Sequence, residues 1–564
     1  MSASHSPGSP STSSSYGLET SPYPKPSRYR QFIDDVSTNR NAYFLTVIAS
    51  FGGMFFGWDT GLIGGILTMS AFQDSFDLDP GSSTYTNLSG NIVSVLQGGC
   101  FFGAMSSFYI SDVFGRKKAL FVADFFFLVG SVIQTASGIG TTSLGQLYVG
   151  RFIGGFGVGL VSAVVPTYIG ENANKEIRGR CVGCMQLFNV TGIMLAYFIN
   201  YGINQNMAGN DPLKWRIPFA LQMLPGLLLG LGLFFQNESP RWLIEKDHHE
   251  EALLALSRVR RRSPDDPLIQ REYNEIIADF HGKEKLSLLR QMKLTVSNKA
   301  SFYAVSMAAI LQFWQQWTGT NSINYYSPQI FETVGLSGTS AGLFATGIYG
   351  VVKVCITALG LLFATEQVGR KWCLIIGGMG QAFAMFYIGI NQAVNPPVSG
   401  ATLNGNSIFA IICVYLFVVF YSFGWGPIPF VLSSECSPNH LRSFSMALAI
   451  AVQWLFNFVI SKITPYLLSG ITYGTFLLFG GCCVLMTVYA VICVPETMNV
   501  PLERIHTLFE GDIIKGAFRD TVPRWRRSNK LREMQRDGEE EEGLGKRDGE
   551  NGMSVHVERV DGGV

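Results

Sequence analysis

The stretch SDVFGRKK (residues 111–118) returns later in the chain as TEQVGRK (365–371). In each copy an acid precedes Gly-Arg-Lys by a short gap, and the motif is flanked by apolar segments of about 20 residues, the length that crosses a bilayer as a helix. Both copies then continue with a proline-broken apolar segment and a Glu that is followed seven residues later by an Arg. Self-similarity over this distance predicts that one unit of six helices occurs twice.

Apolar segments of this length recur along the chain, and we expect each to form a transmembrane helix. They lie at 43–69, 91–110, 119–138, 145–169, 182–202, 215–236, 300–331, 341–364, 372–392, 407–434, 443–468 and 473–494. Of the 564 residues only 15% are charged, whereas a soluble protein has about 25%. The net charge of +1 lacks the basic excess of a nucleic-acid binder. The sequence therefore predicts an all-α membrane protein and no nucleic-acid partner.

The charges in the loops predict how the chain is threaded through the membrane. Lys and Arg gather in alternate loops, with Lys214 and Arg216 as exceptions, so the positive-inside rule places both termini in the cytoplasm. The expected parts are a disordered cytoplasmic N-terminal tail (1–42), a six-helix half (43–236), a cytoplasmic helical linker (237–298), a second six-helix half (299–494) and a cytoplasmic C-terminal tail (495–564).

Modification and metal signals are sparse. Three Asn-x-Ser/Thr sequons occur, and only the one at Asn87 falls in a predicted external loop, so we expect glycosylation there. None of the ten cysteines falls in such a loop, so disulfides are not expected. Cys181 and Cys184 have CxxC spacing but no second pair, so we expect neither a metal site nor a cofactor.

The seventh apolar segment holds the densest set of polar side chains. Gln312, Gln315 and Gln316 share one helix face, and Asn and Tyr residues follow in TNSINYY (320–326). Neutral amides both donate and accept hydrogen bonds, as a neutral polyol requires. Amides that hold helices together are the alternative interpretation. The density of the cluster favours a ligand cavity between the two halves.

Eight motifs occur in a fixed order along residues 43–510: GWDTGLIGG, GRKK, RFIGGFGVG with VPTYIGE and RGR, ESPRWL, QQWTGTNSINYY, VGRK, GWGPIP and PET. Together they resemble the sugar porter family of the major facilitator superfamily, and fungal hexose transporters in particular. The resemblance implies a major facilitator fold of twelve transmembrane helices in two six-helix repeats. It also implies a multi-pass plasma-membrane carrier of a hexose such as glucose that works by alternating access and is not an enzyme.

The resemblance also implies residue roles. Side chains that contact or line the substrate site would be Gln186, Gln312, Gln315, Gln316, Asn321, Gly426, Phe430, Trp454 and Asn457. Tyr325 and Tyr326 would close the external side. Acids and arginines that would join the halves when the inside is shut are Asp112, Arg116, Glu171, Arg178, Glu238, Arg241, Glu366, Arg370, Glu435, Arg442 and Glu496. Charge placement that merely reflects topology is the alternative for this last group.

Three ionisable residues within the apolar spans bear on the solute and on its coupling to protons. Asp59, in GWDTG, and Arg151 match the acid and arginine that couple sugar to protons in the family's symporters, but some fungal facilitators share GWDTG, so symport and facilitated diffusion both stay open. Lys353 replaces an asparagine that the family has near its sugar site. A cation there leaves open an acidic polyol such as quinate, and a buried amine that is partnered or neutral is the alternative interpretation of Lys353. A sugar sensor is a further alternative, although only 70 residues follow Val494.

Overall fold

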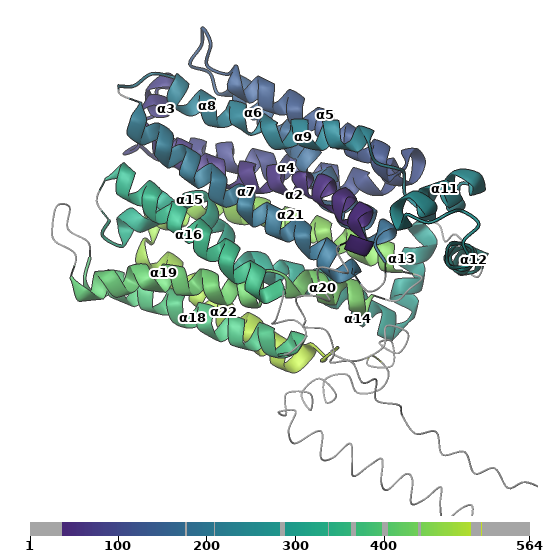
Figure 1. The fold of residues 1–564 in the computed structure, drawn as a ribbon. Coiled ribbons are helices and arrows are strands. Elements are labelled where there is room, and N and C mark those ends of the chain that lie inside the picture. The colour runs from purple at the N-terminus through teal and green to yellow at the C-terminus, as the bar shows by residue number, and fades with distance from the viewer. Residues whose placement is uncertain are drawn as a thin grey trace, which may run out of the picture.

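The computed structural model describes residues 37–174, 177–207, 209–281, 288–336, 338–361, 368–396, 404–437, 441–497 and 509. Within these ranges the regular secondary structure is helical. Ten helices in the described ranges are long and apolar enough to cross a membrane. Figure 1 shows them lying nearly side by side as one bundle.

The first group of helices covers the predicted N-terminal half. Its members are α2 (Arg40–Leu67), α3 (Ser70–Ser75), α4 (Ser83–Phe114), α5 (Arg116–Thr135), α6 (Gly145–Asn172), α7 (Arg178–Asn206), α8 (Leu213–Leu221) and α9 (Met223–Phe234). Helix α6 packs against both α4 and α5, and α2 packs against α7. Glycines make this close packing possible, because a Cβ at Gly99 or Gly103 of α4 would collide with the backbone of α6.

The second group covers the predicted C-terminal half. Its members are α14 (Lys299–Trp317), α15 (Thr320–Thr333), α16 (Thr339–Leu359), α18 (Arg370–Val394), α19 (Gly405–Phe423), α20 (Ile428–Cys436), α21 (Arg442–Gly470) and α22 (Tyr473–Cys493). Helix α18 packs against α22 and α19, and α14 packs against α21 and α20. Two of its predicted spans are therefore broken into pairs of helices, α14 with α15 and α19 with α20.

Among the described residues, the two groups meet chiefly along three helix pairs, α4 with α21, α7 with α16 and α2 with α15. In Figure 1 the purple and blue helices of the first group lie against the green helices of the second. A buried apolar cluster spans the meeting surface, with Leu62 and Tyr197 from the first group and Ile330 and Tyr349 from the second. Van der Waals packing of these side chains stabilises the contact, because lipid tails are as apolar as the side chains and the hydrophobic effect adds little within a bilayer.

Four short helices connect the groups: α10 (Pro240–Glu245), α11 (His249–Arg260), α12 (Pro267–His281) and α13 (Leu288–Ser297). They lie at one end of the bundle (Figure 1). Ser239 caps α10 by accepting a hydrogen bond from the backbone N–H of Trp242 (3.3 Å). Buried apolar residues of α10 and α11, among them Leu243 and Leu256, form a small core of their own.

The predicted spans agree closely with the helices. Ten coincide with helices or helix pairs that meet the length and apolarity of a membrane crossing, whereas α2 and the α14–α15 pair are not among those ten. The segment 300–331 is divided at Gly319, whose φ of 84° ends α14. The count of twelve transmembrane helices, the cytoplasmic termini and the domain boundaries stay predictions.

Candidate functional site

A buried ion pair joins α2 to α6. Arg151 Nη1 lies 3.4 Å from Asp59 Oδ1, and the two side chains are 0% and 1% exposed. The contact is single, because Asp59 Oδ2 and Arg151 Nε and Nη2 have no hydrogen-bond partner within the described residues. A buried charge is costly unless it is paired, so the cationic partner expected for Asp59 is present.

The amides of the seventh predicted span are hydrogen-bonded to one another. Gln315 Nε2 donates to the backbone carbonyls of Trp425 (3.0 Å) and Gly426 (2.9 Å), between α19 and α20. Gln316 Nε2 donates to Gln315 Oε1 (3.1 Å), and Asn321 Nδ2 donates to Gln316 Oε1 (2.5 Å). The structure thus brings three predicted substrate ligands together and places them beside the break in the tenth predicted span.

Lys353 of α16 extends this group of amides. Its side chain is 4% exposed, and Nζ donates to Asn324 Oδ1 (3.0 Å). The ammonium also lies 6.0 Å from the ring centre of Tyr349 and 5.7 Å from that of Tyr421. No carboxylate forms an ion pair with Lys353 in the part of the chain that the structure describes. Among the described residues, the partners of its ammonium group are the Asn324 side-chain oxygen and two aromatic faces.

The other predicted ligands surround this group at different depths. Gln312 is fully buried, and neither atom of its amide has a hydrogen-bond partner among the described residues. Trp454 Nε1 donates to Ser162 Oγ of α6 (3.1 Å), which links α21 to the first group of helices. Gln186 of α7 and Phe430 of α20 are partly buried. The buried, unpartnered amide of Gln312 is therefore suited to bind a hydroxyl group of the solute.

The predicted external lid is shut. Tyr325 and Tyr326 are each 1% exposed. Tyr325 donates through its hydroxyl to Asn457 Oδ1 (3.3 Å), and Tyr326 donates to the Ser461 carbonyl (3.1 Å). The Tyr325 backbone also lies so close to Gly64 of α2 that a Cβ there would come within 2.5 Å of its carbonyl oxygen. Both tyrosines are therefore buried at the contact between the two groups of helices, and their role as an external lid stays a prediction.

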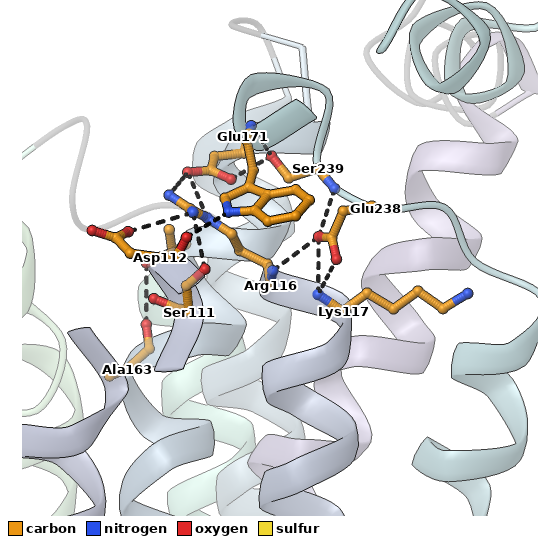
Figure 2. A network of polar contacts seen from close by, with 10 residues as sticks. Ser111, Asp112, Arg116, Lys117, Ala163, Glu171, Glu238 and Ser239 are labelled. Carbon is orange, nitrogen blue, oxygen red and sulfur yellow. Dashed lines mark hydrogen bonds and ion pairs between the residues drawn. The ribbon is translucent and has the colours of Figure 1, made fainter. Parts of the chain in front are cut away.

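A polar network surrounds the first GRK turn (Figure 2). Arg116 Nη2 pairs with Glu171 Oε1 (3.0 Å), and its Nη1 lies 3.5 Å from Asp112 Oδ1. Glu238 Oε1 accepts the backbone N–H groups of Arg116 (2.9 Å) and Lys117 (3.0 Å), which begin α5. A carboxylate at a helix N-terminus satisfies donors that have no partner in the helix. Burial raises the pKa of Glu238.

The second GRK turn repeats this network. Arg370 Nη2 pairs with Glu435 Oε1 (3.1 Å), as Arg116 pairs with Glu171. Glu496 Oε1 accepts the backbone N–H of Arg370 (3.0 Å), and its Oε2 accepts that of Lys371 (3.2 Å). Thr497 Oγ1 donates to Glu435 Oε2 (2.6 Å), as Ser239 does to Glu171. The two copies therefore share hydrogen bonds as well as sequence.

These ion pairs lie within each group of helices rather than between the groups. Among the described residues, Arg116 pairs with Glu171 and Arg370 pairs with Glu435, each within one group of helices, and bridges between the halves stay a prediction. Arg178 lies among like charges that include Arg241 and Arg442. Glu366 lies outside the described residues. The gating role of all these residues stays a prediction.

Sequence reasoning missed several partners. Asn324 was part of the dense polar stretch, three residues from Asn321, but was not assigned to the site. It accepts from Lys353 through its side chain and from the Tyr197 hydroxyl (2.9 Å) through its backbone carbonyl. Ser162, the partner of Trp454, carried no sequence signal. Such partners come from distant helices, so spacing along the chain does not reveal them.

Asn87, the predicted glycosylation site, lies at the start of α4 and contacts α21. Lys462 Nζ donates to Asn87 Oδ1 (2.8 Å) and also to Asn91 Oδ1. The Tyr466 hydroxyl donates to Asn87 Oδ1 (2.9 Å). This cluster of Asn87, Asn91, Lys462 and Tyr466, which we call the α4–α21 clasp, joins the two groups of helices. Glycosylation of Asn87 stays a prediction.

Within the described ranges no group of three or more His, Cys, Asp or Glu side chains could hold a metal ion. All ten cysteines are free thiols.

Comparisons with known proteins identify the family. The family model described as "Sugar (and other) transporter" matches residues 45–509. A probable quinate permease of Aspergillus fumigatus is 36% identical over 479 residues, which cover 84% of this chain and 88% of the relative. A probable quinate permease of Aspergillus niger is 36% identical over 499 residues, 87% of this chain and 90% of the relative.

Solved structures of the same superfamily share the fold. The proton:xylose symporter XylE bound to 6-bromo-6-deoxy-D-glucose has a TM-score of 0.70 and 29% identity, with 84% of this chain and 100% of that chain covered. Inward-open XylE from E. coli has a TM-score of 0.69 and 28% identity, with 83% and 100% covered. The relatives quoted above are named quinate permeases rather than the hexose transporters that the motifs suggested. The chain belongs to the sugar transporter family of the major facilitator superfamily and is a multi-pass membrane transporter rather than an enzyme.

Proposed function

We propose that this protein carries an acidic polyol, of which quinate is the model, across the plasma membrane by alternating access and in symport with protons. The buried cation of Lys353 beside a row of amides is the observation that carries the choice of solute. The amides suit the hydroxyls of the solute, and the ammonium suits its carboxylate.

The substrate assignment follows from the surroundings of Lys353. An ammonium buried in a bilayer costs free energy that a neutral amide only partly offsets. A solute carboxylate would supply the missing opposite charge and would be selected over a neutral sugar by that charge. The quinate permeases at 36% identity support the same solute class.

Proton coupling rests on the Asp59–Arg151 pair. With both side chains buried and a single contact of 3.4 Å, the pair depends on the charge of Asp59. Protonation of Asp59 removes that charge, and the arginine is then free to take another position. The similarity to a protein named as a proton:xylose symporter supports this role.

A neutral hexose is the second candidate solute. The amides of Gln312 and Gln316 suit neutral hydroxyls, and the XylE structure holds a glucose derivative. In this case Lys353 would keep its bonds to Asn324 and the tyrosine faces and would have no contact with the solute.

Uptake by whole cells tests these proposals. The full chain would be expressed in cells that lack their own hexose and quinate carriers, and labelled quinate and glucose would be supplied with and without an uncoupler. We expect quinate to accumulate and the uncoupler to abolish its accumulation. Lys353→Asn should lower quinate uptake at least about tenfold, because a charge-assisted hydrogen bond is lost, while any glucose uptake persists.

Other outcomes decide between the alternatives. Glucose accumulation without quinate uptake would replace the acidic polyol with the hexose. Uptake that equilibrates but never concentrates, with or without the uncoupler, would establish a facilitator. Solute binding to the purified protein without any uptake would favour a sugar sensor.

A further inference from the structure

The polar side chains of α14, α15 and α16 form one continuous chain of hydrogen bonds, which we call the amide relay. It runs from Lys353 to Asn324 (3.0 Å) and from Asn324 Nδ2 to Asn321 Oδ1 (3.2 Å). It continues from Asn321 to Gln316 (2.5 Å) and from Gln316 to Gln315 (3.1 Å). In each link the nitrogen of one residue donates to the side-chain oxygen of the next.

The amide relay ends on the helix break between α19 and α20. Gln315 Nε2 donates to the carbonyls of Trp425 (3.0 Å) and Gly426 (2.9 Å). In a continuous helix the Trp425 carbonyl would accept from the N–H four residues later, but that residue is Pro429, which has none. Gln315 thus satisfies a buried carbonyl that the break leaves without a helical partner.

The direction of the amide relay is fixed at both ends. A lysine ammonium can only donate, so Asn324 must turn its oxygen to Lys353 and its NH2 group to Asn321. A backbone carbonyl can only accept, so Gln315 must turn its NH2 group to the break. The amides between them are forced into the same head-to-tail order. Hydrogen bonds in such a chain polarise and strengthen one another.

We propose that Gln315 is a positioning residue that holds the α19–α20 break in place, and that Lys353 keeps Gln315 oriented for this task through the amide relay. Gln315 then acts on the break rather than as a ligand of the solute. A solute carboxylate that binds Lys353, or a solute hydroxyl inserted between two amides, would reorient Gln315 through the relay. The solute would thereby alter the hydrogen bonds at the α19–α20 break without contacting the break itself. That last step rests on the proposed function, whereas the relay itself does not.

Reversal of the relay provides a direct test. In Asn324→Asp the side chain only accepts, so Asn321 must turn its NH2 group toward it, and each later amide turns in the same way. Gln315 would then present its oxygen to the two carbonyls and repel them. The charge of Lys353 remains paired in this variant, which favours folding. Asn324→Leu cuts the relay without reversing it.

Hydrogen–deuterium exchange of residues 421–431 is the readout, measured on the purified full chain in nanodiscs without solute. We expect roughly tenfold faster exchange in Gln315→Leu, because a buried pair of hydrogen bonds is lost. Asn324→Asp should exchange at the same rate as Gln315→Leu, and Asn324→Leu should exchange at a rate between those of Asn324→Asp and the wild type. The double variant Asn324→Asp/Gln315→Leu should exchange no faster than Gln315→Leu.

The matched control is Gln134→Leu, because Gln134 is a buried amide that donates to the Gly150 carbonyl (3.3 Å) in the other group of helices. It should leave exchange in 421–431 unchanged. Wild-type exchange in Gln315→Leu would overturn the holding role of Gln315. Fast exchange in Gln315→Leu with equal, wild-type-like exchange in both Asn324 variants would overturn the relay.

Two safeguards keep the result interpretable. If Asn324→Asp yields no folded protein, the neutral variant Asn324→Leu decides alone, because it removes the link without adding a charge, and wild-type exchange of residues 421–431 in that variant would overturn the relay. The exchange measurement needs no solute, so a failure of quinate uptake would remove the proposed substrate and leave the relay standing. Conversely, normal quinate uptake by the wild type together with unchanged exchange in the Gln315 and Asn324 variants would leave the proposed substrate standing and remove the relay.

Discussion

Replacing Asp59 by asparagine removes one charge of the buried pair and leaves the other. Asp59 and Arg151 are 1% and 0% exposed, and a single contact of 3.4 Å joins them. Asparagine keeps the size of the side chain and mimics a permanently protonated carboxyl. The variant therefore separates the charge of Asp59 from its shape.

The size of the effect can be worked from this geometry. Removal of one partner from a buried ion pair costs about 3–5 kcal/mol, because the remaining charge is left without compensation. The pair has one long contact rather than two short ones, so the low end applies. We expect Asp59→Asn to lower the free energy of unfolding by about 3 kcal/mol, roughly a hundredfold in the equilibrium constant.

Two transport assays would separate coupling from movement. In proteoliposomes with an imposed proton gradient, Asp59→Asn should no longer concentrate labelled quinate, because no proton is bound and released in the cycle. Exchange of labelled for unlabelled quinate at equal concentrations needs no net proton movement and should persist. Denaturant unfolding of the same preparation measures the loss of stability.

Asp124→Asn is the matched control. Asp124 is 5% exposed and lies on α5 against Gly230 of α9, with no ion-pair partner among the described residues. Its neutral replacement should leave concentrative uptake intact. An Asp59→Asn protein that still concentrates quinate and acidifies the vesicle lumen would refute the assignment of Asp59 as the coupling residue.

Four further substitutions test the repeated turns and the contact between the helix groups. Gly115→Ala and Gly369→Ala should each lower the free energy of unfolding by about 1–2 kcal/mol, because φ is 95° and 97° at these positions; unchanged thermal unfolding would contradict this. Burial raises the pKa of Glu238, so the folded protein binds this proton more readily than the unfolded chain does. The wild type should therefore gain stability relative to Glu238→Gln as the pH falls through the raised pKa toward the ordinary value of 4.5, and a loss in thermal unfolding would show the wrong sign. Lys462→Met removes the cation of the α4–α21 clasp and should speed hydrogen exchange at residues 83–91 several-fold; wild-type exchange there would show that the clasp does not hold α4.

The helices were predictable because a bilayer imposes length and apolarity on every span. Segments such as 145–169 and 473–494 match α6 (Gly145–Asn172) and α22 (Tyr473–Cys493) to within a few residues. The breaks were harder to place. Gly319 ends α14 through a positive φ, and the carbonyls freed before Pro429 are satisfied by a side chain from another helix. Composition alone does not show which distant donor fills such a gap.

The candidate site was predicted as a set of residues but not as a set of contacts. The amide cluster and the Asp59–Arg151 pair could be found, because polar groups are rare in apolar spans. The pairing of the GRK turns could not, because Glu171 lies 55 residues from Arg116 and any of several acids was a plausible partner. The contacts of Gln315 are the clearest case, since its amide donates to two backbone carbonyls between α19 and α20 and no spacing in the sequence links these residues.

Glycines line the three seams where the helix groups meet. A Cβ at Gly64 would lie 2.5 Å from the Tyr325 carbonyl, one at Gly90 would lie 3.1 Å from the Lys462 carbonyl, and one at Gly350 would lie 2.9 Å from the Met194 Cα. Helix surfaces that carry glycine have few side chains that interlock with the facing helix, so little packing has to be undone when the two groups of helices separate. Internal friction along these seams should therefore be low. A methyl group added at any of the three glycines should lower the transport rate more than it changes the affinity for the solute.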